Sequence, residues 1–298
     1  MLISPQYEAF LAEQAAHKWP PREDTLTGFR FLLTDSSVSP AEVAKIALSC
    51  AAIEANPIPE YGDIWSVLMA AVERFPEQND RLVDFTVALQ QLPNYDGEMH
   101  ELDGLAMHLT EFTFNHADHS FNETTRDQER CGFVNANLFT AKLYLRIPRP
   151  NKFGFFIGFG SQVLRKTLES APWERFHHPR IEAYLEDVEE DSLYNQLRDE
   201  ELEVIDIRTL NGFVPAAAVW IEYCGQEIYR KEGSLGQEIS AWDKWRGPAG
   251  WSKERWGFWK QRLEWISTVT ALDRKTRKIA MRLVEQMTRI EQGEDGII

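Results

Sequence analysis

The sequence predicts an all-α fold, a single-domain bundle of about ten helices with a Trp-rich helix at its centre. Apolar residues recur at the three- and four-residue spacing of helices along most of the 298-residue chain. Alternating patterns typical of strands do not extend beyond four residues outside residues 202–210. Six of the ten tryptophans fall within residues 240–266. The helical pattern predicted over 252–269 covers the second half of this stretch.

Helix start and stop signals divide the N-terminal half. The first helix is expected over Pro5 to His17, and the prolines that follow Trp19 end it. Residues 39–42, Ser-Pro-Ala-Glu, form a capping box that begins the next helix. Asp63 and Asn79 are expected to cap two more helices, and a further one covers residues 102–114.

The C-terminal half continues the helical pattern. Further helices are predicted over residues 127–145, 155–168, 179–188, 215–231, 252–269 and 273–290. The clearest break is the segment 147–152, Ile-Pro-Arg-Pro-Asn-Lys. Because this segment is short and both flanking helices are apolar enough to pack together, the sequence predicts one domain over 1–298, with a soft boundary near 147–153.

Composition excludes several classes of function. The formal net charge of -15 predicts a surface that repels nucleic acids and anionic membranes. The three cysteines form no disulfide or zinc pattern and fit a reduced, cytoplasmic compartment. The N-terminus does not resemble a signal peptide, and no apolar run is long enough to span a bilayer. We therefore expect a cytoplasmic protein without nucleic-acid or membrane partners; a homo-oligomer stays open.

The Trp-rich helix carries two apolar stripes. Trp256 and Trp259 share one face with Leu263 and Ile266, and Phe258 and Trp265 lie near the opposite face. Two stripes indicate either a central core helix or a helix with one face on a cavity. Trp245 precedes the helix in a loop, where it could cover a pocket, and the glycine-rich stretch with Phe155 and Phe159 could wall the same cavity.

Polar residues lie among these apolar patterns at two places. Asn137, Thr140 and Tyr144 form a polar seam along the helix predicted over 127–145, and its hydrogen-bond partners are either other side chains or a ligand. His108 and Glu111 share a helical face at i,i+3 spacing, which suits general acid–base catalysis or a metal site. No third ligand follows from the pattern, so we assign no metal and no cofactor.

Several motifs resemble a fungal family catalogued as domain of unknown function 3632. Residues 137–143, Asn-Leu-Phe-Thr-Ala-Lys-Leu, are similar to its Asn-x-Phe-x-Ala-Arg-Leu helix, with Lys142 in place of Arg. Residues 219–229 resemble its Trp-Ile-x-x-x-Gly segment. Residues 250–260 resemble its Gly-Phe-Ser-x-x-Arg-Trp-x-x-Trp signature, with Trp251 in place of Phe. The resemblance implies an all-helical, intracellular fungal protein and supplies no catalytic residues.

Two classes of function stay open. The first is a cofactor-free enzyme or binder of fungal, including secondary, metabolism, with isomerase or cyclase chemistry on an apolar metabolite in an aromatic-lined pocket. The isomerase or cyclase chemistry is an analogy with other uncharacterised fungal proteins. From the residue patterns, the catalytic residues would be His108, Glu111, Asn137 and Tyr144, and the substrate-binding residues Phe155, Phe159, Trp245, Trp256 and Trp259. The second is a non-enzymatic scaffold that uses the acidic surface of residues 182–203.

Overall fold

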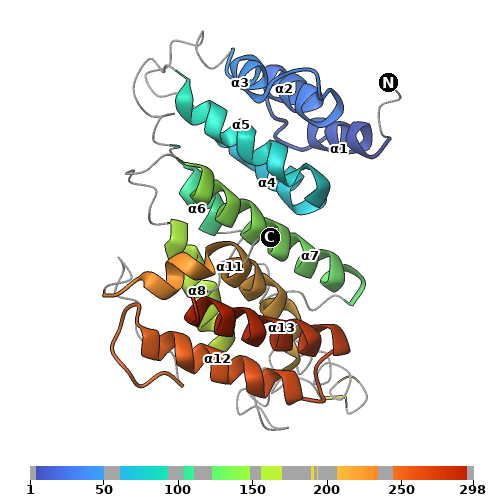
Figure 1. The fold of residues 1–298 in the computed structure, drawn as a ribbon. Helices are drawn as coiled ribbons and strands as arrows, with labels where there is room; N and C mark the ends of the chain where they lie inside the picture. The colour runs from blue at the N-terminus through green and yellow to red at the C-terminus, as the bar shows by residue number, and fades with distance from the viewer. Residues whose placement is uncertain are drawn as a thin grey trace. The chain divides into compact units, whose positions relative to one another are not determined.

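The computed structural model confirms the predicted all-α fold (Figure 1). It describes residues 5–49, 61–92, 102, 104–110, 123–147, 156–169, 189–190, 193, 207–233 and 244–293. Within these ranges the chain forms 11 α-helices and two short 3-10 helices. The described residues form no strand, and their one β-type contact is an isolated bridge between Gly233 and Trp251.

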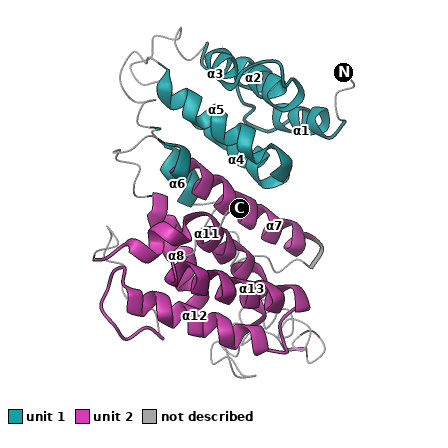
Figure 2. Cartoon of the chain, viewed as in Figure 1, with its two compact units in different colours: residues 1–112, 145–148 teal, residues 113–144, 149–298 magenta. Residues whose placement is uncertain are grey.

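The chain divides into two compact units (Figure 2). Unit 1 comprises Met1–Phe112 and Leu145–Pro148, and unit 2 comprises Thr113–Tyr144 and Arg149–Ile298. Compactness alone does not measure whether the units unfold together, so the single domain expected from the sequence stays a prediction. Each unit is described below by itself.

The described residues of unit 1 form six α-helices and one 3-10 turn. They are α1 (Pro5–Ala15), α2 (Glu23–Thr34), α3 (Pro40–Ala47), α4 (Gly62–Arg74), η1 (Pro76–Gln78), α5 (Asn79–Gln91) and α6 (Leu105–Thr110). Helix α3 packs against α2 and α5, and α4 packs against α6. The core between them is apolar and aromatic; Phe29 and Phe85, for example, meet edge to face at 5.3 Å.

Helix α2 was not predicted from the sequence. Its centre holds Thr25, Thr27 and Gly28, which are weak helix formers. The structure explains the glycine, because a Cβ at Gly28 would lie 2.9 Å from the Cβ of Ala47 on α3. Close packing of α2 on α3 therefore needs a residue that local helix propensity disfavours.

Of the three helix caps predicted in unit 1, one is confirmed and two are wrong. Ser39 and Glu42 form the expected capping box, with both reciprocal hydrogen bonds present. Asp63 does not cap α4; its carboxylate instead accepts the backbone N–H of Arg22. Asn79 does not cap α5, because it is itself the first residue of the helix. The turn begun by Pro76 leads directly into α5, and the Pro76 carbonyl accepts the Asn79 N–H.

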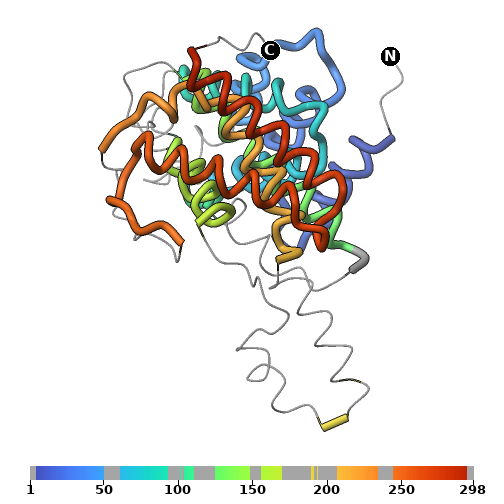
Figure 3. The backbone as a smooth tube through the Cα atoms, turned by 60° about the horizontal axis from the view of Figure 1, so that its bottom comes forward, coloured from blue at the N-terminus to red at the C-terminus, as the bar shows by residue number. Residues whose placement is uncertain are grey.

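Unit 2 contains the longer helices. They are α7 (Glu123–Arg146, whose last two residues belong to unit 1), α8 (Phe156–Leu168), η6 (Ile207–Thr209), α11 (Leu210–Arg230), α12 (Lys253–Thr268) and α13 (Arg274–Glu291). Helix α11 packs against α8 and α13, and α12 packs chiefly against α13. A second view shows α12 and α13 side by side again (Figure 3). The helix predicted over 179–188 lies outside the described residues.

Helix α11 begins earlier than predicted. The sequence suggested Pro215 as its first residue, but the helix starts at Leu210 and includes this proline. The buried residues Gly212, Phe213 and Val214 extend the apolar face toward the N-terminus, and η6 precedes it directly. Tertiary packing thus outweighs the preference of proline for the first helical position.

Candidate functional site

Helices α7 and α11 of unit 2 are joined by two hydrogen bonds with the same sequence offset. The Trp220 indole N–H donates to the Asn137 Oδ1 at 2.8 Å, across 83 residues. The Tyr144 hydroxyl donates to the Glu227 Oε1, again across 83 residues. An identical offset over seven residues of helix means that α7 and α11 run parallel and in register at these positions.

The first of these bonds is part of a sealed core. Asn137 and Trp220 are both fully buried, and the Asn137 amide also donates to the Phe133 carbonyl at 2.9 Å. Thr140, the next residue of the seam, donates to the Ala136 carbonyl at 2.8 Å. Asn137 and Thr140 are therefore satisfied by the protein, which is one of the two alternatives that the sequence left open for the polar seam.

Glycine on α8 makes room for the Trp220 ring. A Cβ at Gly160 would lie 2.4 Å from the Trp220 Cε3, whereas a Cβ at Gly158 would meet nothing within 4 Å. The predicted site residue Phe159 is buried beside Phe156, with ring centroids 6.1 Å apart. Phe155 lies outside the described residues. The glycine-rich stretch thus serves close helix packing in this region.

The second bond belongs to a group of three titratable side chains at a less buried place, the Tyr144–Glu227–Lys231 group. Tyr144 is 5% exposed, but the Glu227 and Lys231 side chains are 27% and 32% exposed. The Lys231 Nζ lies 3.4 Å from the same Glu227 oxygen that accepts the Tyr144 hydroxyl. A phenol, a carboxylate and an ammonium therefore meet at one oxygen of a partly exposed side chain.

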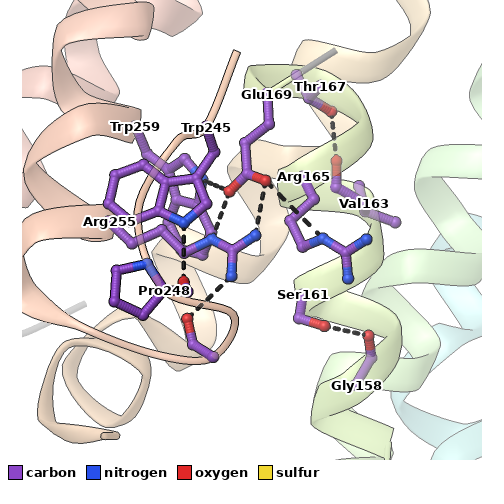
Figure 4. A network of polar contacts seen from close by, with 11 residues as sticks. Gly158, Ser161, Val163, Arg165, Thr167, Glu169, Trp245, Pro248, Arg255 and Trp259 are labelled. Atoms are coloured by element: carbon purple, nitrogen blue, oxygen red, sulfur yellow. Dashed lines mark hydrogen bonds and ion pairs between the residues drawn. The ribbon is translucent and has the colours of Figure 1, made fainter. Parts of the chain in front are cut away.

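Trp259 belongs to a buried ionic cluster of unit 2, the Glu169 network of Arg165, Glu169, Arg255 and Trp259 (Figure 4). Glu169 accepts from the Arg255 Nε at 2.5 Å and from its Nη2 at 2.7 Å. The Trp259 indole N–H donates to the same carboxylate at 2.7 Å. The Glu169 side chain has no exposure, and Arg255 has 1%.

Arg165 adds a second buried cation to this network. Its Nε lies 3.9 Å from the Glu169 Oε2, and its side chain is 1% exposed. Burial and, after it, the like charge of Arg255 lower the pKa of Arg165 to about 10, against the attraction of Glu169. Arg165 remains a cation at neutral pH. A network so fully enclosed offers a substrate no access and ties α8 to α12.

The loop before α12 closes over this network. The Arg255 Nη1 donates to the Gly250 carbonyl, and Ser252 caps the helix as predicted. Trp245 is buried, donates its N–H to the Pro248 carbonyl at 2.9 Å, and packs against Phe258. The signature Gly-Trp-Ser-x-x-Arg-Trp-x-x-Trp of residues 250–259 therefore encodes much of the network and its cap.

Trp256 differs from Trp259 in the hydrogen bonding of its indole N–H. It is 2% exposed and packs at 5.5 Å from the Tyr229 ring. Its indole N–H has no hydrogen-bond partner in the part of the chain that the structure describes. A buried donor without an acceptor costs about 1–3 kcal/mol, so a water molecule or a ligand acceptor would be stabilised there.

The predicted histidine site lies mostly outside the described residues, as does Glu111. His108 is part of α6 in unit 1, and its Nδ1 lies 3.0 Å from the Gly104 carbonyl oxygen. The pairing of His108 with Glu111 stays a prediction. Of the acidic run 182–203, only Glu189, Glu190 and Leu193 are described, and all three are exposed.

Sequence reasoning missed Glu169, Arg165, Glu227 and Lys231. A weak signal existed, since Arg165–Glu169 and Glu227–Lys231 are both spaced i,i+4, which suits ion pairs on a helix. The same spacing is common on solvated helix faces, so it did not single these residues out.

Comparison with known proteins identifies a family and no individual relative. The profile of a family described as "Protein of unknown function (DUF3632)" matches residues 65–263. No curated protein and no solved structure matches the chain. Within the described residues, no helix is both long and apolar enough to cross a membrane.

Proposed function

Because the chain belongs to the DUF3632 family of proteins of unknown function, we propose its function from the side chains alone. The protein is a cofactor-free isomerase or cyclase that moves a proton within an apolar small molecule. This activity agrees with the fungal metabolism that the family resemblance implies. The observation that carries this proposal is the Tyr144–Glu227–Lys231 group, in which an acid and a base share one hydrogen bond at a partly buried position.

The reaction uses the Glu227 carboxylate and then the Tyr144 phenol. Glu227 takes a proton from a carbon of the substrate, and the electron pair of that C–H bond moves into the conjugated system of the substrate. Tyr144 gives its phenolic proton to the far end of that system, where a new C–H or O–H bond forms. The protonated carboxyl then passes its proton to the phenolate across the hydrogen bond that joins them. The side chains return to their starting state without an oxidant or a reductant.

Lys231 and Asn137 have supporting roles. The Lys231 ammonium lies beside the oxygen through which the charge passes, so it stabilises the negative charge that moves between carboxylate and phenolate. Asn137 is a positioning residue, because its bond to Trp220 fixes the register that brings Tyr144 to Glu227. Since acid and base are adjacent, the proton is removed and returned on the same face of the substrate.

Deuterium incorporation tests the proposal with a mixture of candidate substrates. The full chain is incubated in deuterated buffer with a fungal metabolite extract. Mass spectrometry then searches for products that are isomers of a compound in the extract and carry one deuterium. Tyr144→Phe and Glu227→Gln should each lower the rate about 100-fold or more. Tyr223→Phe, on the same helix as Glu227 and with an exposed ring, is the matched control and should retain the rate.

Two results would refute the proposed function. One is the absence of any compound whose conversion depends on the protein. The other is a conversion that Tyr144→Phe and Glu227→Gln leave unchanged while both variants keep the unfolding temperature of the wild type.

A further inference from the structure

The loop between α1 and α2 of unit 1 presents a tryptophan to solvent. Trp19 is 81% exposed, the largest value among the large hydrophobic residues that the structure describes. It lies outside residues 65–263, the range that the family profile matches. An exposed side chain of this size gains much from burial against a partner, since tryptophan is enriched among residues that dominate binding energies.

The residues after Trp19 favour the polyproline II conformation. Proline fixes φ near -65° at positions 20 and 21, and a residue that precedes proline is restricted to extended conformations. Arg22 follows with φ -58° and ψ 151°, which lies in the polyproline II region. Residues 20–22, Pro-Pro-Arg, thus favour an extended segment of the kind that proline-binding modules recognise, and Trp19 lies in a bend directly before it.

The chain is anchored on both sides of Trp19 and the two prolines. The Arg22 N–H donates to the Asp63 carboxylate at 3.1 Å, and the Arg22 Nε lies 3.8 Å from Asp24 and 4.0 Å from Asp63. Before Trp19, the His17 N–H donates to the Gln14 carbonyl as the chain leaves α1. A partner would therefore meet a segment that is already ordered, which lowers the entropic cost of binding.

We propose that residues 18–21, Lys-Trp-Pro-Pro, dock into the aromatic-lined groove of a polyproline-II-binding protein module. The two prolines and the exposed indole match the way such modules take proline-rich segments onto aromatic side chains. The Lys18 Nζ lies 5.7 Å from the Trp19 ring centroid, so a positive charge accompanies the indole. A groove with an acidic rim fits both. This surface is independent of the Tyr144–Glu227–Lys231 group and of the proposed enzymatic function.

Direct binding to purified modules tests the inference. The full chain is titrated against one SH3, one WW and one EVH1 domain by biolayer interferometry. We expect at least one of them to bind, and Trp19→Ala to weaken that binding about thirtyfold, as expected for an interface centred on a tryptophan. Replacing both prolines, Pro20→Ala and Pro21→Ala, should weaken it as well. Met107→Ala, which removes another exposed side chain of unit 1, should have no effect.

Unfolding temperatures of all variants are measured alongside, and Trp19→Ala should leave its value unchanged because the side chain is exposed. The proposal is overturned if none of the three modules binds, or if wild type and Trp19→Ala bind equally. Vesicles of phosphatidylcholine with phosphatidylserine provide a second readout. Binding to vesicles that Trp19→Ala abolishes, without binding to a module, would assign the surface to a lipid bilayer and overturn the proposal too.

Discussion

Replacing Glu169 with glutamine removes one negative charge from the network in Figure 4 and leaves the shape of the side chain nearly unchanged. In the native protein this carboxylate accepts two hydrogen bonds from Arg255 and one from Trp259, all within 2.7 Å. Glutamine presents an NH2 group to some of these donors, and the Arg255 guanidinium stays buried without its carboxylate. Removing one partner of a buried ion pair costs about 3–5 kcal/mol.

The measurement is the free energy of unfolding in urea, together with the thermal midpoint. A loss of that size should lower the unfolding temperature by about 5–8 °C in a protein of this length. Glu222→Gln is the matched control, because Glu222 pairs with Arg282 on the exposed side of the same unit. Breaking an exposed pair should cost less than about 1 kcal/mol.

A double replacement separates the charge effect from packing. Glu169→Leu combined with Arg255→Leu removes the closest ion pair and leaves only Arg165 charged, so it should be less destabilising than Glu169→Leu alone, which leaves two buried cations without their carboxylate. The reasoning is refuted if Glu169→Gln is as benign as Glu222→Gln. In that case the Glu169 network would not hold α8 to α12.

Three further predictions concern packing and capping in unit 2, all measured by urea unfolding. Gly160→Ala should cost about 1–3 kcal/mol, because its Cβ would enter a buried ring; Gly158→Ala on the same helix has open space and should not destabilise, so equal losses would contradict this packing. Asn137→Leu should cost about 1–3 kcal/mol by leaving a buried indole N–H without its acceptor, whereas Thr140→Val should be milder, since it loses only a bond to the carbonyl of its own helix. Ser252→Ala should cost about 1 kcal/mol through the lost helix cap, and an unchanged stability would contradict that role.

Local signals in the sequence predicted the helices better than their starting residues. The capping box at Ser39 and the cap at Ser252 are confirmed, because both depend on residues only three positions apart. The stripe of Trp256, Trp259, Leu263 and Ile266 is buried as expected, while Phe258 and Trp265 on the other side are only half-buried. The predicted start of α11 at Pro215 was wrong, because packing of the residues before this proline extends the helix back to Leu210.

The candidate site was predictable only in part. Tyr144 was identified because a polar residue on an apolar helix needs a partner, but Glu227 depends on the register of two helices far apart in sequence. Glu169 escaped for the same reason, since its contacts with Arg255 and Trp259 span 86 and 90 residues. Pairings of this kind follow from the assembled fold and leave no periodic trace in one sequence.

The parallel pairing of α7 and α11 has a consequence for synthesis on the ribosome. Short loops join antiparallel helices, so parallel neighbours need a long connection, and Trp220 emerges 83 residues after Asn137. At about 5–20 residues per second, this delay lasts roughly 4–17 s. During that time Asn137 and Tyr144 of α7, which are buried and bonded to α11 in the finished protein, lack these partners. The nascent chain therefore leaves this face of α7 uncovered until α11 arrives.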